Sequence, residues 1–462
     1  MLIDDLKNIV GDKGWSVDEE TLEPHLNEWR GELRGKTLIM VSPRTTAEVA
    51  AVIKACAAEN VGVVPQGGNT SLCGGAIPDD SGEQVLLSLS RLNTIRAVDA
   101  DDFSIVVEAG CILAAVQNAA QGVDRLYPLS LGAEGSCQIG GNLSTNAGGI
   151  NVIRYGTARQ QVLGLEVVLA DGTIWDGLRS LRKDTAGYDM KQMFIGSEGT
   201  LGIITAATLK LYPQPVATTT VFAALHNANQ AVALLALLRK KLADGIQAFE
   251  LISDRCLRFV ARHVPNAKPP FDDDYPWFVL CELIDTGQES IVEDAFAAAM
   301  NGGLVSDAII AKSTAEAERF WRLRHSIAEA EKPEGANLKH DVSVPISRMD
   351  EFLTRGEQLI EAIYPTARLV AFGHVGDGNL HYNVAQPVGD DGDQFIEKGA
   401  ALTAAIYDLV AEMGGSFSAE HGVGVVKKDQ MERYRSTAEL DLMRAMKTAL
   451  DPNNILNPGK VI

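Results

Sequence analysis

An unusually glycine-rich stretch runs from Gly132 to Gly156 and limits the structures that this part of the chain can form. Its centre reads GSCQIGGNLSTNAGG over residues 135–149, which mixes glycine with small polar side chains. Such a segment cannot build a hydrophobic core by itself, but its bare backbone can lie flat against a large ligand and form hydrogen bonds along it. A flexible surface loop is the alternative, yet a loop needs no such ordered mix of Gly with Asn, Ser and Thr. We therefore predict that this segment binds a ligand.

A second glycine loop, VPQGGNTS over residues 64–71, follows an apolar strand pattern. Backbone N–H groups exposed by glycine form a concave nest for phosphate oxygens, and Asn69, Thr70 and Ser71 can add side-chain donors. A plain strand-to-helix turn is the alternative. The sequence lacks both the GxGxxG fingerprint that opens a βαβ unit and the Walker motif. We therefore expect a phosphate-bearing ligand to be held by a different fold.

Composition narrows the class of protein. The chain has 462 residues, too many for one core, so two or three domains of roughly 100–200 residues are expected. The formal net charge of −20 argues against nucleic acid as a partner, and an acidic substrate would need a local positive site. The six cysteines form no CxxC pair, and the first residues lack a signal peptide. No apolar stretch approaches the roughly 18 residues of a membrane span, so a cytoplasmic protein is expected.

Strand–helix–strand patterning begins at Lys36. Residues 37–43 and 61–68 are predicted as strands on either side of a helix over 45–60, which Thr45 or Thr46 can cap. After the prolines of LYPQP (211–215), alternating strands and helices predict an α+β sandwich. Further strands are predicted at 84–90, 104–110 and 163–175.

The segment GHVGDGNLHYN (373–383) is predicted to form a hairpin around a four-residue GDGN turn. That turn would place Val375 opposite Leu380 and His374 opposite His381. Directly opposed residues have Cβ atoms about 4.5–5.5 Å apart, from which two imidazoles can converge on one ion. Two separate hydrogen-bonded histidines are the alternative, but only eight histidines occur in the chain and these two are placed symmetrically about the turn.

The segment SAEHGVG (418–424) places a carboxylate beside an imidazole. Glu420 would complete a set of two histidines and one carboxylate, which suits zinc, manganese or iron(II). His421 would then remain available as a base. A helix-start turn with solvent-facing side chains is the alternative for this segment considered alone.

Two basic clusters, Arg322-Leu323-Arg324-His325 and Lys339-His340-Asp341, are candidates for the positive site. An arginine can bind a carboxylate through a two-pronged fork. Salt bridges on a solvated helix, with Glu316, Glu318 and Glu329, explain the arginines equally well from spacing alone.

From about Trp29 to the C-terminus, these motifs together resemble the FAD-linked D-2-hydroxy-acid dehydrogenases of the vanillyl-alcohol-oxidase / p-cresol-methylhydroxylase superfamily. The resemblance is greatest to the D-2-hydroxyglutarate and D-lactate dehydrogenase branch. The most specific segments are PQGGNTSLCGG (65–75), LGAEGSCQIGGNLSTNAGG (131–149), RYG (154–156), GLEVVLADG (164–172), GYDMKQMFIGSEGTLGIIT (187–205), GHVGDGNLHYN (373–383), SAEHGVG (418–424) and NPGK (457–460).

The resemblance implies an α+β fold: a PCMH-type FAD-binding domain of two subdomains, an α+β ferredoxin-like substrate domain and a C-terminal helical segment. Residues 1–35 would be a helical lead-in with one amphipathic helix, 36–215 the FAD-binding domain, 216–415 the substrate domain, and 416–462 a segment that returns to the flavin.

The resemblance also implies where FAD binds. Residues 65–71 would wrap its pyrophosphate, and residues 135–149 would flank the rest of the cofactor. Some relatives attach FAD covalently through a histidine after the first glycine pair; here that position is Asn69, so non-covalent FAD is implied. The implied FAD-binding residues are Pro65, Gln66, Gly67, Gly68, Asn69, Thr70, Ser71, Gly74, Gly75, Gly135, Ser136, Gly140, Gly141, Asn142, Ser144, Thr145, Gly148, Gly149, Tyr155, Glu198, Gly199, Gly202, Ile204 and Asn457.

Roles for the remaining motifs follow from the same resemblance. The family's metal ligands match His374, His381 and Glu420, its catalytic histidine matches His421, and its residues for the substrate carboxylate match Arg324 and Lys339, with Asn383 nearby. Zinc is the divalent metal that we expect. One departure concerns the substrate, because this chain has Ala328 where the animal 2-hydroxyglutarate enzymes place a threonine that contacts it.

The expected reaction is metal-assisted oxidation of a D-2-hydroxy acid to the 2-oxo acid, by hydride transfer to flavin N5. The metal would lower the pKa of the substrate hydroxyl, and His421 would take its proton. D-2-Hydroxyglutarate is the first candidate substrate, followed by D-malate and D-lactate. The expected electron acceptor is an electron-transfer flavoprotein or a quinone. A homodimer is the assembly that we consider. The alternatives are a D-lactate or glycolate oxidase that uses O₂, a catalytically silent flavoprotein subunit and, last, a metal hydrolase.

Overall fold

The computed structural model describes residues 2–284 and 290–462, and the chain packs into two compact units. Unit 1 contains Met1–Gly148, Tyr155–Gln214 and Glu420–Ile462, whereas unit 2 contains Gly149–Arg154 and Pro215–Ala419. The chain therefore leaves unit 1 twice and returns to it twice.

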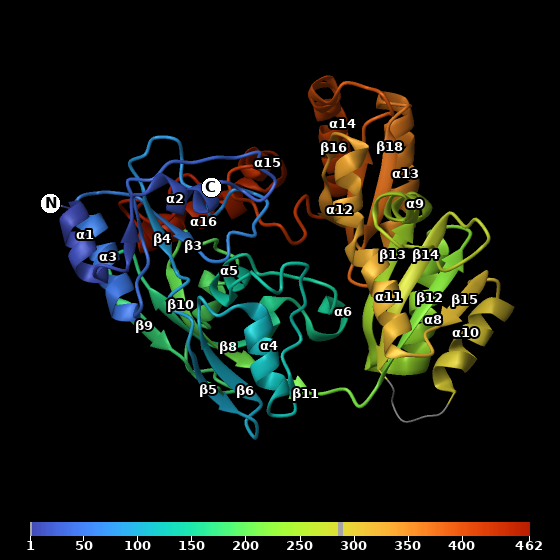
Figure 1. Ribbon diagram of the computed structural model, residues 1–462, viewed down its shortest axis with the longest axis horizontal. Coiled ribbons are helices and arrows are strands. Elements are labelled where there is room, and N and C mark those ends of the chain that lie inside the picture. Colours follow the sequence, from blue (N-terminus) through green and yellow to red (C-terminus); the bar gives the residue numbers. More distant parts are fainter. Residues whose placement is uncertain (1, 285–289) are drawn as a thin grey trace. The chain divides into compact units, whose positions relative to one another are not determined.

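The first sheet of unit 1 contains the strands of the predicted strand–helix–strand pattern (Figure 1). Its order is β1-β2-β4-β3, with β2 and β3 both parallel to β4 and β1 antiparallel to β2. Thr45 caps α3, because its hydroxyl oxygen accepts a hydrogen bond of 3.1 Å from the Glu48 N–H. The elements are α1 (Leu2–Val10), β1 (Trp15–Ser16), α2 (Glu19–Leu26), β2 (Ile39–Val41), α3 (Thr46–Ala58), β3 (Val63–Gln66) and β4 (Val85–Ser88).

The second sheet of unit 1 is antiparallel, in the order β5-β6-β10-β8-β9. Alternate residues of its strands, such as Ile105 and Val107, pack with Leu113 and Val116 of α4 in a buried core. The elements are β5 (Ile95–Asp99), β6 (Ser104–Glu108), α4 (Leu113–Gln121), α5 (Ile139–Ser144), β8 (Val162–Val168), β9 (Ile174–Gly177), α7 (Lys191–Phe194) and β10 (Ile203–Lys210), with β7 (Arg125–Leu126) paired to β11 (Tyr212–Pro213).

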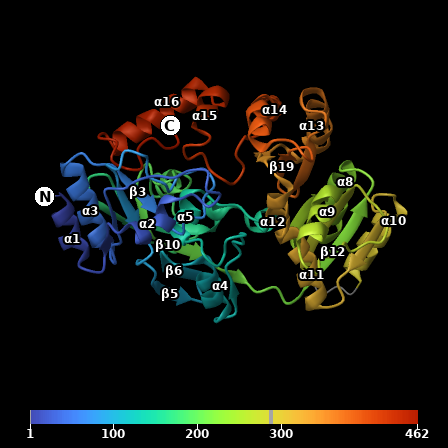
Figure 2. The ribbon, with the colours of Figure 1, turned by 45° about the horizontal axis from the view of Figure 1, so that its top comes forward.

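The C-terminal segment belongs to unit 1. In Figures 1 and 2 the red helices α15 (Lys428–Tyr434) and α16 (Thr437–Leu450) lie with the blue N-terminal elements. The segment then extends the edge of the first sheet, since Val63 N–H donates to the Ile455 carbonyl and Asn457 N–H donates to the Val63 carbonyl.

Unit 2 is built on one antiparallel sheet in the order β15-β12-β14-β13-β18-β19-β16, with β17 also paired to β19. Phenylalanines at 222, 278 and 320 meet edge to face in its core. The strands are β12 (Thr218–Leu225), β13 (Ile246–Ser253), β14 (Trp277–Ile284), β15 (Asp307–Ile310), β16 (Asn337–Leu338), β17 (Asp341–Ser343), β18 (Arg368–Gly373) and β19 (Asn379–Ala385). The helices are α8 (Asn229–Leu242), α9 (Asp254–His263), α10 (Ile291–Asn301), α11 (Thr314–His325), α12 (Ile327–Glu331), α13 (Met349–Ile363) and α14 (Gly392–Glu412), and the short α6 (Val152–Tyr155) ends at the boundary with unit 1.

The α+β architecture agrees with the class predicted from the sequence. One local expectation was wrong, because residues 1–35 form two helices, α1 and α2, rather than one. Between them lies β1, whose Trp15 pairs with Val41 of β2. The chain breaks there because Gly11 adopts a left-handed φ of 68°, a conformation that ends a helix.

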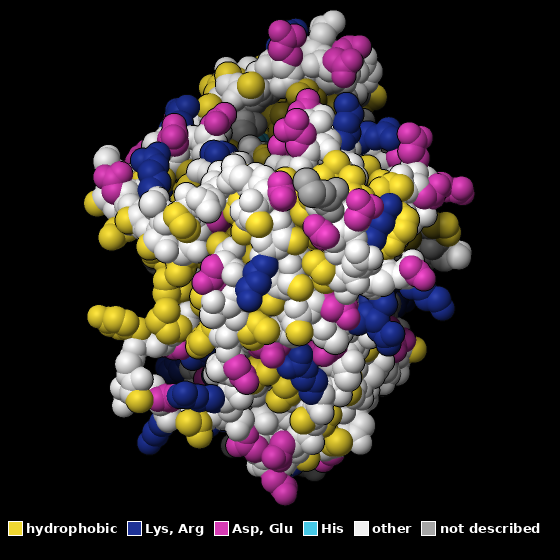
Figure 3. All heavy atoms as spheres, turned by 90° about the vertical axis from the view of Figure 1, so that its left-hand side faces the viewer, with side chains coloured by type: hydrophobic (Ala, Val, Ile, Leu, Met, Phe, Trp, Pro, Cys, Tyr) yellow, Lys and Arg dark blue, Asp and Glu magenta, His cyan; other side chains and the backbone are white. Residues whose placement is uncertain are grey.

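Charged side chains are interspersed on the face of the molecule shown in Figure 3, where acidic and basic groups alternate with apolar ones. Within the described ranges, no helix is both long enough and apolar enough to cross a bilayer.

Candidate functional site

The hairpin that carries His374 and His381 forms, but its register differs from the predicted one. His381 pairs with Phe372, and the pairing of β18 with β19 stops there, so His374 lies in the connecting loop rather than opposite His381. Gly373 is the cause: its φ of 145° turns the chain, and a Cβ there would lie 3.1 Å from both the Asn379 carbonyl oxygen and the Leu380 Cα. The two imidazoles still come together, with ring centroids 5.8 Å apart.

The neighbouring strand supplies a carboxylate that orients His374. In the antiparallel pairing of β13 with β18, Leu251 lies opposite Gly373, which places Glu250 beside His374. Glu250 has no exposed side-chain surface, and its Oε1 contacts the Nδ1 of His374. Since an ionised carboxylate only accepts hydrogen bonds, Nδ1 carries the proton and Nε2 presents its lone pair. This is the usual way in which a protein orients a histidine that binds a metal.

Glu250 also binds Arg324 of α11, whose Nε donates to Glu250 Oε2 at 2.6 Å. Burial raises the pKa of Glu250, but His374 and Arg324 outweigh it and lower that pKa to about 2. Arg324 is itself buried, and its guanidinium lies 4.8 Å from the ring centroid of Phe372. The alternative that spacing left open, salt bridges with Glu316, Glu318 and Glu329 on a solvated helix, therefore does not hold for Arg324.

His381 faces a second buried carboxylate. Its Nδ1 lies 3.8 Å from Asp341 Oδ1 on β17, and Asp341 pairs directly with His381 across the sheet. The Nδ2 of Asn379 donates to the same Asp341 oxygen at 2.9 Å and holds it in place. Glu250 thus contacts Nδ1 of His374 directly, whereas Asp341 lies near Nδ1 of His381 beyond hydrogen-bond distance. Two imidazoles with two buried acids behind them are a set of side chains that fits a divalent cation.

Lys339 and Asn383 converge on a buried acid, Glu331, at the end of α12. Lys339 forms an ion pair with Glu331, and the Nδ2 of Asn383 donates to both of its carboxylate oxygens at 3.0 and 3.2 Å. Neither Glu250 nor Glu331 was among the residues predicted from the sequence. The available signal for Glu250 was a lone charge inside the apolar strand IQAFELIS.

The remaining member of the second basic cluster is structural. His340 is buried, with Nδ1 at 2.7 Å from the Tyr382 carbonyl oxygen and Nε2 at 3.0 Å from Thr403 Oγ1. His340 is therefore a satisfied core histidine, whereas Lys339 lies at the predicted site.

In unit 1, the loops at 65–71 and 135–141 lie against each other. A Cβ on Gly68 would lie 2.2 Å from the Ser136 carbonyl oxygen, so glycine is required for this approach. The N–H groups of Gly68, Asn69 and Thr70 donate to no other described residue. Unused donors grouped in a turn form the kind of nest that binds phosphate oxygens.

Two observations on this pair of loops fit a bound cofactor. Gly141 in α5 meets nothing within 4 Å of an added Cβ, so packing within the protein gives no reason for a glycine there. The buried Oε1 of Gln138 has no hydrogen-bond partner among the described residues, and a buried acceptor left in this way is costly. A ligand that lies along the loop would explain both.

Several predicted cofactor residues use their side chains within the protein. Gln66 bonds to His25 and to the Ala76 carbonyl, and Asn69 Nδ2 bonds to the carbonyls of Pro24 and Asn27. The hydroxyls of Ser144 and Thr145 donate to helix carbonyls four residues earlier. These residues therefore offer a ligand mainly their backbone. Other predicted residues are packing positions: Gly140 against Ala109, Gly199 against Pro65, Gly202 against Val167, Gly74 against Leu33, Tyr155 against Tyr212, and Ile204 in the core.

Glu198 holds the returning C-terminal segment. Its carboxylate accepts from the N–H groups of Val423 at 2.7 Å and Gly424 at 2.9 Å. Burial raises the pKa of Glu198 and outweighs the effect of these two hydrogen bonds. Asn457 adds a second tie, since its Nδ2 donates to the carbonyls of Gly75 and Glu198 at 2.9 and 2.7 Å.

Glu420 and His421 stand at the first positions of this segment. Glu420 lies against Gly148, where an added Cβ would be 2.6 Å from Glu420 Oε1. The preceding residue, Ala419, belongs to unit 2 and donates its N–H to the Asp341 carbonyl at 3.2 Å. The chain is therefore anchored on both sides of Glu420 and His421.

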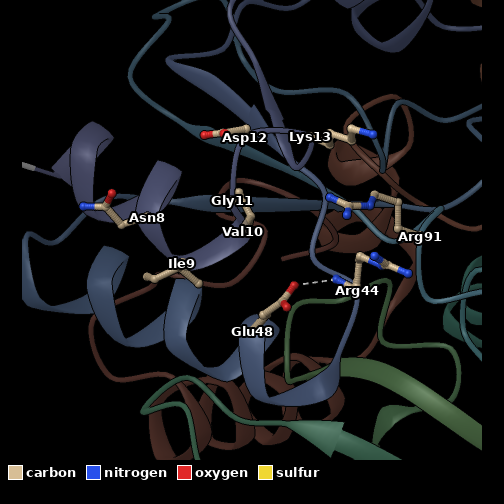
Figure 4. A pocket seen from close by; sticks show the side chains of 9 residues that line it. All are labelled: Asn8, Ile9, Val10, Gly11, Asp12, Lys13, Arg44, Glu48 and Arg91. Carbon is tan, nitrogen blue, oxygen red and sulfur yellow. Dashed lines mark hydrogen bonds between the residues drawn. The ribbon is translucent and has the colours of Figure 1, made fainter.

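The cavities of the two units lie apart from these residues. A cavity of about 480 Å³ lies where the end of α1 approaches the start of α3 (Figure 4), and there the Arg44 N–H donates to Glu48 Oε2 at 2.7 Å. Its lining residues are Asn8, Ile9, Val10, Gly11, Asp12, Lys13, Arg44, Glu48 and Arg91. A second cavity, of about 290 Å³, is lined in unit 2 by Ile153, Arg154, Arg239, Ala243, Asp244 and Ile246. No predicted site residue lines either one.

Comparison with protein families decides the class. The model of the C-terminal domain of FAD linked oxidases matches residues 214–461, and an FAD binding domain model matches residues 37–177. The chain belongs to the FAD-linked oxidase family. It is an FAD-dependent oxidoreductase, as the resemblance predicted, whereas the glycine loops by themselves predicted only a phosphate-bearing ligand.

Individual relatives agree with this assignment. This FAD-linked oxidase is 40% identical over 442 residues to the D-2-hydroxyglutarate dehydrogenase of Xanthomonas citri pv. viticola, a match that covers 95% of this chain and 92% of the relative. It is 38% identical to the mitochondrial D-2-hydroxyglutarate dehydrogenase of Bos taurus, over 96% of this chain and 80% of the relative. Among solved structures, p-cresol methylhydroxylase superposes with a TM-score of 0.74 at 16% identity, covering 100% of this chain and 96% of the other. The predicted PCMH-type fold is thereby confirmed.

Proposed function

We propose that this FAD-linked oxidase catalyses the metal-assisted, FAD-dependent oxidation of a D-2-hydroxy acid to the 2-oxo acid. The observation that carries the proposal is the pair His374 and His381, each backed by a buried carboxylate. The names of the relatives support D-2-hydroxyglutarate as the first candidate substrate, with D-malate and D-lactate next.

The metal ligands in this proposal are His374, His381 and Glu420. Glu250 orients the ring of His374, and Asp341 lies 3.8 Å from Nδ1 of His381. The anchored backbone of Ala419 limits where Glu420 can reach. A divalent cation, with zinc our first choice, would supply a Lewis acid that lowers the pKa of the substrate hydroxyl. FAD would accept the electron pair of the oxidised C–H bond and pass it to a flavoprotein or quinone acceptor.

His421 is the proposed general base. His421 follows Glu420 directly, and two residues later the N–H of Val423 donates to Glu198. The backbone is therefore held by hydrogen bonds before and after His421. In the proposed reaction its imidazole takes the proton from the α-hydroxyl oxygen of the substrate. Arg324, Lys339 and Asn383 are the proposed contacts for the substrate carboxylates.

An anaerobic screen of D- and L-2-hydroxy acids tests the proposal. The purified yellow protein should be bleached by at least one D-acid, and a chelator should prevent the bleaching without removing FAD. The His421→Ala variant should keep its flavin spectrum and lose at least about 100-fold in the rate of bleaching. His226→Ala removes an exposed histidine of unit 2 and serves as the matched control.

Two results would overturn the proposal. If no 2-hydroxy acid bleached the flavin, the chain would act as a silent flavoprotein. If the His421→Ala variant bleached at the wild-type rate, His421 would not be the base. Rapid recovery of the yellow colour in air, with peroxide formed, would instead identify an oxidase that uses O₂.

A further inference from the structure

We infer that Glu331 determines the choice between 2-hydroxy acids that carry a second carboxylate and those that do not. The inference rests on the proposed function, because it concerns the substrate of that same site. In this interpretation the protein's own carboxylate occupies the donors that a second substrate carboxylate would need. Glu331 therefore lowers the preference of the site for diacids such as D-2-hydroxyglutarate over acids with an uncharged side chain, without excluding diacids as substrates.

The carboxylate of Glu331 is buried and surrounded by hydrogen-bond donors. Its side chain is only 1% exposed, and a glutamate that is buried in its charged form needs several polar partners. It finds them in the ion pair with Lys339, in Asn383 Nδ2 at 3.0 and 3.2 Å, and in Asn337 Nδ2 at 3.2 Å. This carboxylate is therefore built into the protein as an acceptor.

The side chains around Glu331 lie beside the histidine pair. Asn383 follows His381 by two residues on β19, so the two side chains leave the same face of the sheet. The Oδ1 of Asn383 accepts from the His340 N–H at 3.2 Å, which fixes the amide with its Nδ2 toward Glu331. The Lys339 side chain is 35% exposed, so a ligand can reach it.

The positive side chains proposed to bind the substrate are already balanced by acids of the protein. Arg324 and Lys339 are the cations proposed for substrate carboxylates, and each already faces a buried acid, Glu250 and Glu331 respectively. The two cations and two acids together carry no formal charge. A metal at the histidine pair would favour the α-carboxylate of any 2-hydroxy acid, but a second carboxylate near Lys339 would meet Glu331 as a like charge.

The experiment compares a diacid with a monoacid in the holoenzyme. For wild type and Glu331→Gln, kcat/KM is measured for D-2-hydroxyglutarate and for D-2-hydroxybutyrate, which lacks the second carboxylate. Glutamine keeps the size and the acceptor oxygen of the side chain but removes its charge. We expect the ratio of kcat/KM for the diacid to kcat/KM for the monoacid to be about tenfold higher in Glu331→Gln than in wild type, which corresponds to about 1.4 kcal/mol.

Two control variants make the reading specific. Glu329→Gln removes an exposed charge from the same helix, where Glu329 pairs with Lys332 rather than Lys339, and should leave the ratio unchanged. In the Lys339→Met background, Glu331→Gln should change the ratio by less than about twofold, because the cation that the diacid would use is gone. If Glu331 had a purely structural role, the Glu331→Gln substitution would lower kcat/KM for both substrates by the same factor.

Binding of unreactive acids separates this inference from the proposed function. Glutarate and butyrate are titrated into wild type and Glu331→Gln by calorimetry, and the variant should gain affinity for glutarate only. Suppose that the enzyme oxidised D-2-hydroxy acids, but that Glu331→Gln changed neither the ratio of kcat/KM values nor the affinity for glutarate relative to butyrate. The role of Glu331 would then be refuted and the proposed function would stand. If nothing were oxidised while glutarate affinity rose in the variant, the proposed function would fail and the role of Glu331 would stand.

Discussion

Replacing Glu250 by glutamine tests the central physical argument, that one buried carboxylate both balances Arg324 and orients His374. Glutamine keeps the shape of the side chain and removes its negative charge. Arg324 would then remain buried without its counter-charge, at a site where its side chain is 9% exposed and that of Glu250 is not exposed at all. Removing one partner of a buried pair costs about 3–5 kcal/mol, and because glutamine can still accept a hydrogen bond we expect about 3 kcal/mol.

Two assays separate the two roles of Glu250. Urea unfolding should show the midpoint of unit 2 lowered by about 1 M, since a slope of about 2–3 kcal/mol per molar urea converts the expected loss. Competition with a chromogenic chelator should show zinc affinity reduced by about 10–100-fold, because His374 loses the acceptor that orients its ring. Glu282→Gln on the neighbouring strand β14 is the matched control, since Glu282 is hydrogen-bonded by Trp321 and Gln247 rather than by a cation.

Two results would contradict the two roles of Glu250 separately. An unfolding midpoint equal to that of the Glu282→Gln control would show that the Arg324–Glu250 pair contributes nothing measurable. An unchanged zinc affinity, measured at a temperature where the variant is folded, would show that Glu250 does not prepare His374 for a metal.

Three further predictions follow from single features of the structure. Gly141→Ala should raise the stability of the FAD-depleted protein by up to about 1 kcal/mol, because alanine favours a helix, yet weaken FAD binding in a titration; unchanged FAD affinity would place the cofactor elsewhere. Burial raises the pKa of Glu334, but its bonds to Arg368, His263 and Arg262 outweigh this and lower the pKa to about 2, so its stabilising effect is complete above about pH 4.5 and is lost as the pH falls toward 2. Acid titration of the unfolding free energy should therefore show a loss of about 2 kcal/mol over that range, after allowance for solvent screening, and a smaller loss in Glu334→Gln; equal losses would contradict it. Removal of metal by chelation should abolish bleaching by substrate with the flavin spectrum intact, and added zinc should restore it; bleaching that survives complete metal removal would refute metal assistance.

Much of the local structure could be predicted from the sequence, because local rules determine it. The short apolar segments at 84–90 and 104–110 predicted the strands Val85–Ser88 and Ser104–Glu108, and the capping pattern at Thr45 predicted the start of α3. The glycine loops predicted a cofactor because so many bare backbone groups have no other use. The resemblance then supplied roles that spacing alone left open.

The register of the histidine hairpin could not be predicted in the same way. The GDGN sequence favours a four-residue turn, but the pairing of β13 with β18 and the bend at Gly373 end the hairpin earlier. His374 nonetheless meets His381, because a register change of two residues keeps side chains on the same face of a strand.

Local patterns along the chain were sufficient to predict the alternation of elements, the glycine-rich loops and the candidates His374, His381, Glu420 and His421. The acids that lie behind these side chains are distant in sequence, so they could be found only in the folded protein. Glu250 reaches His374 across 124 residues of chain, and Glu331 reaches Asn383 across 52. Such partners are chosen by the order and register of strands in the folded sheet, and no local pattern in the sequence encodes that order.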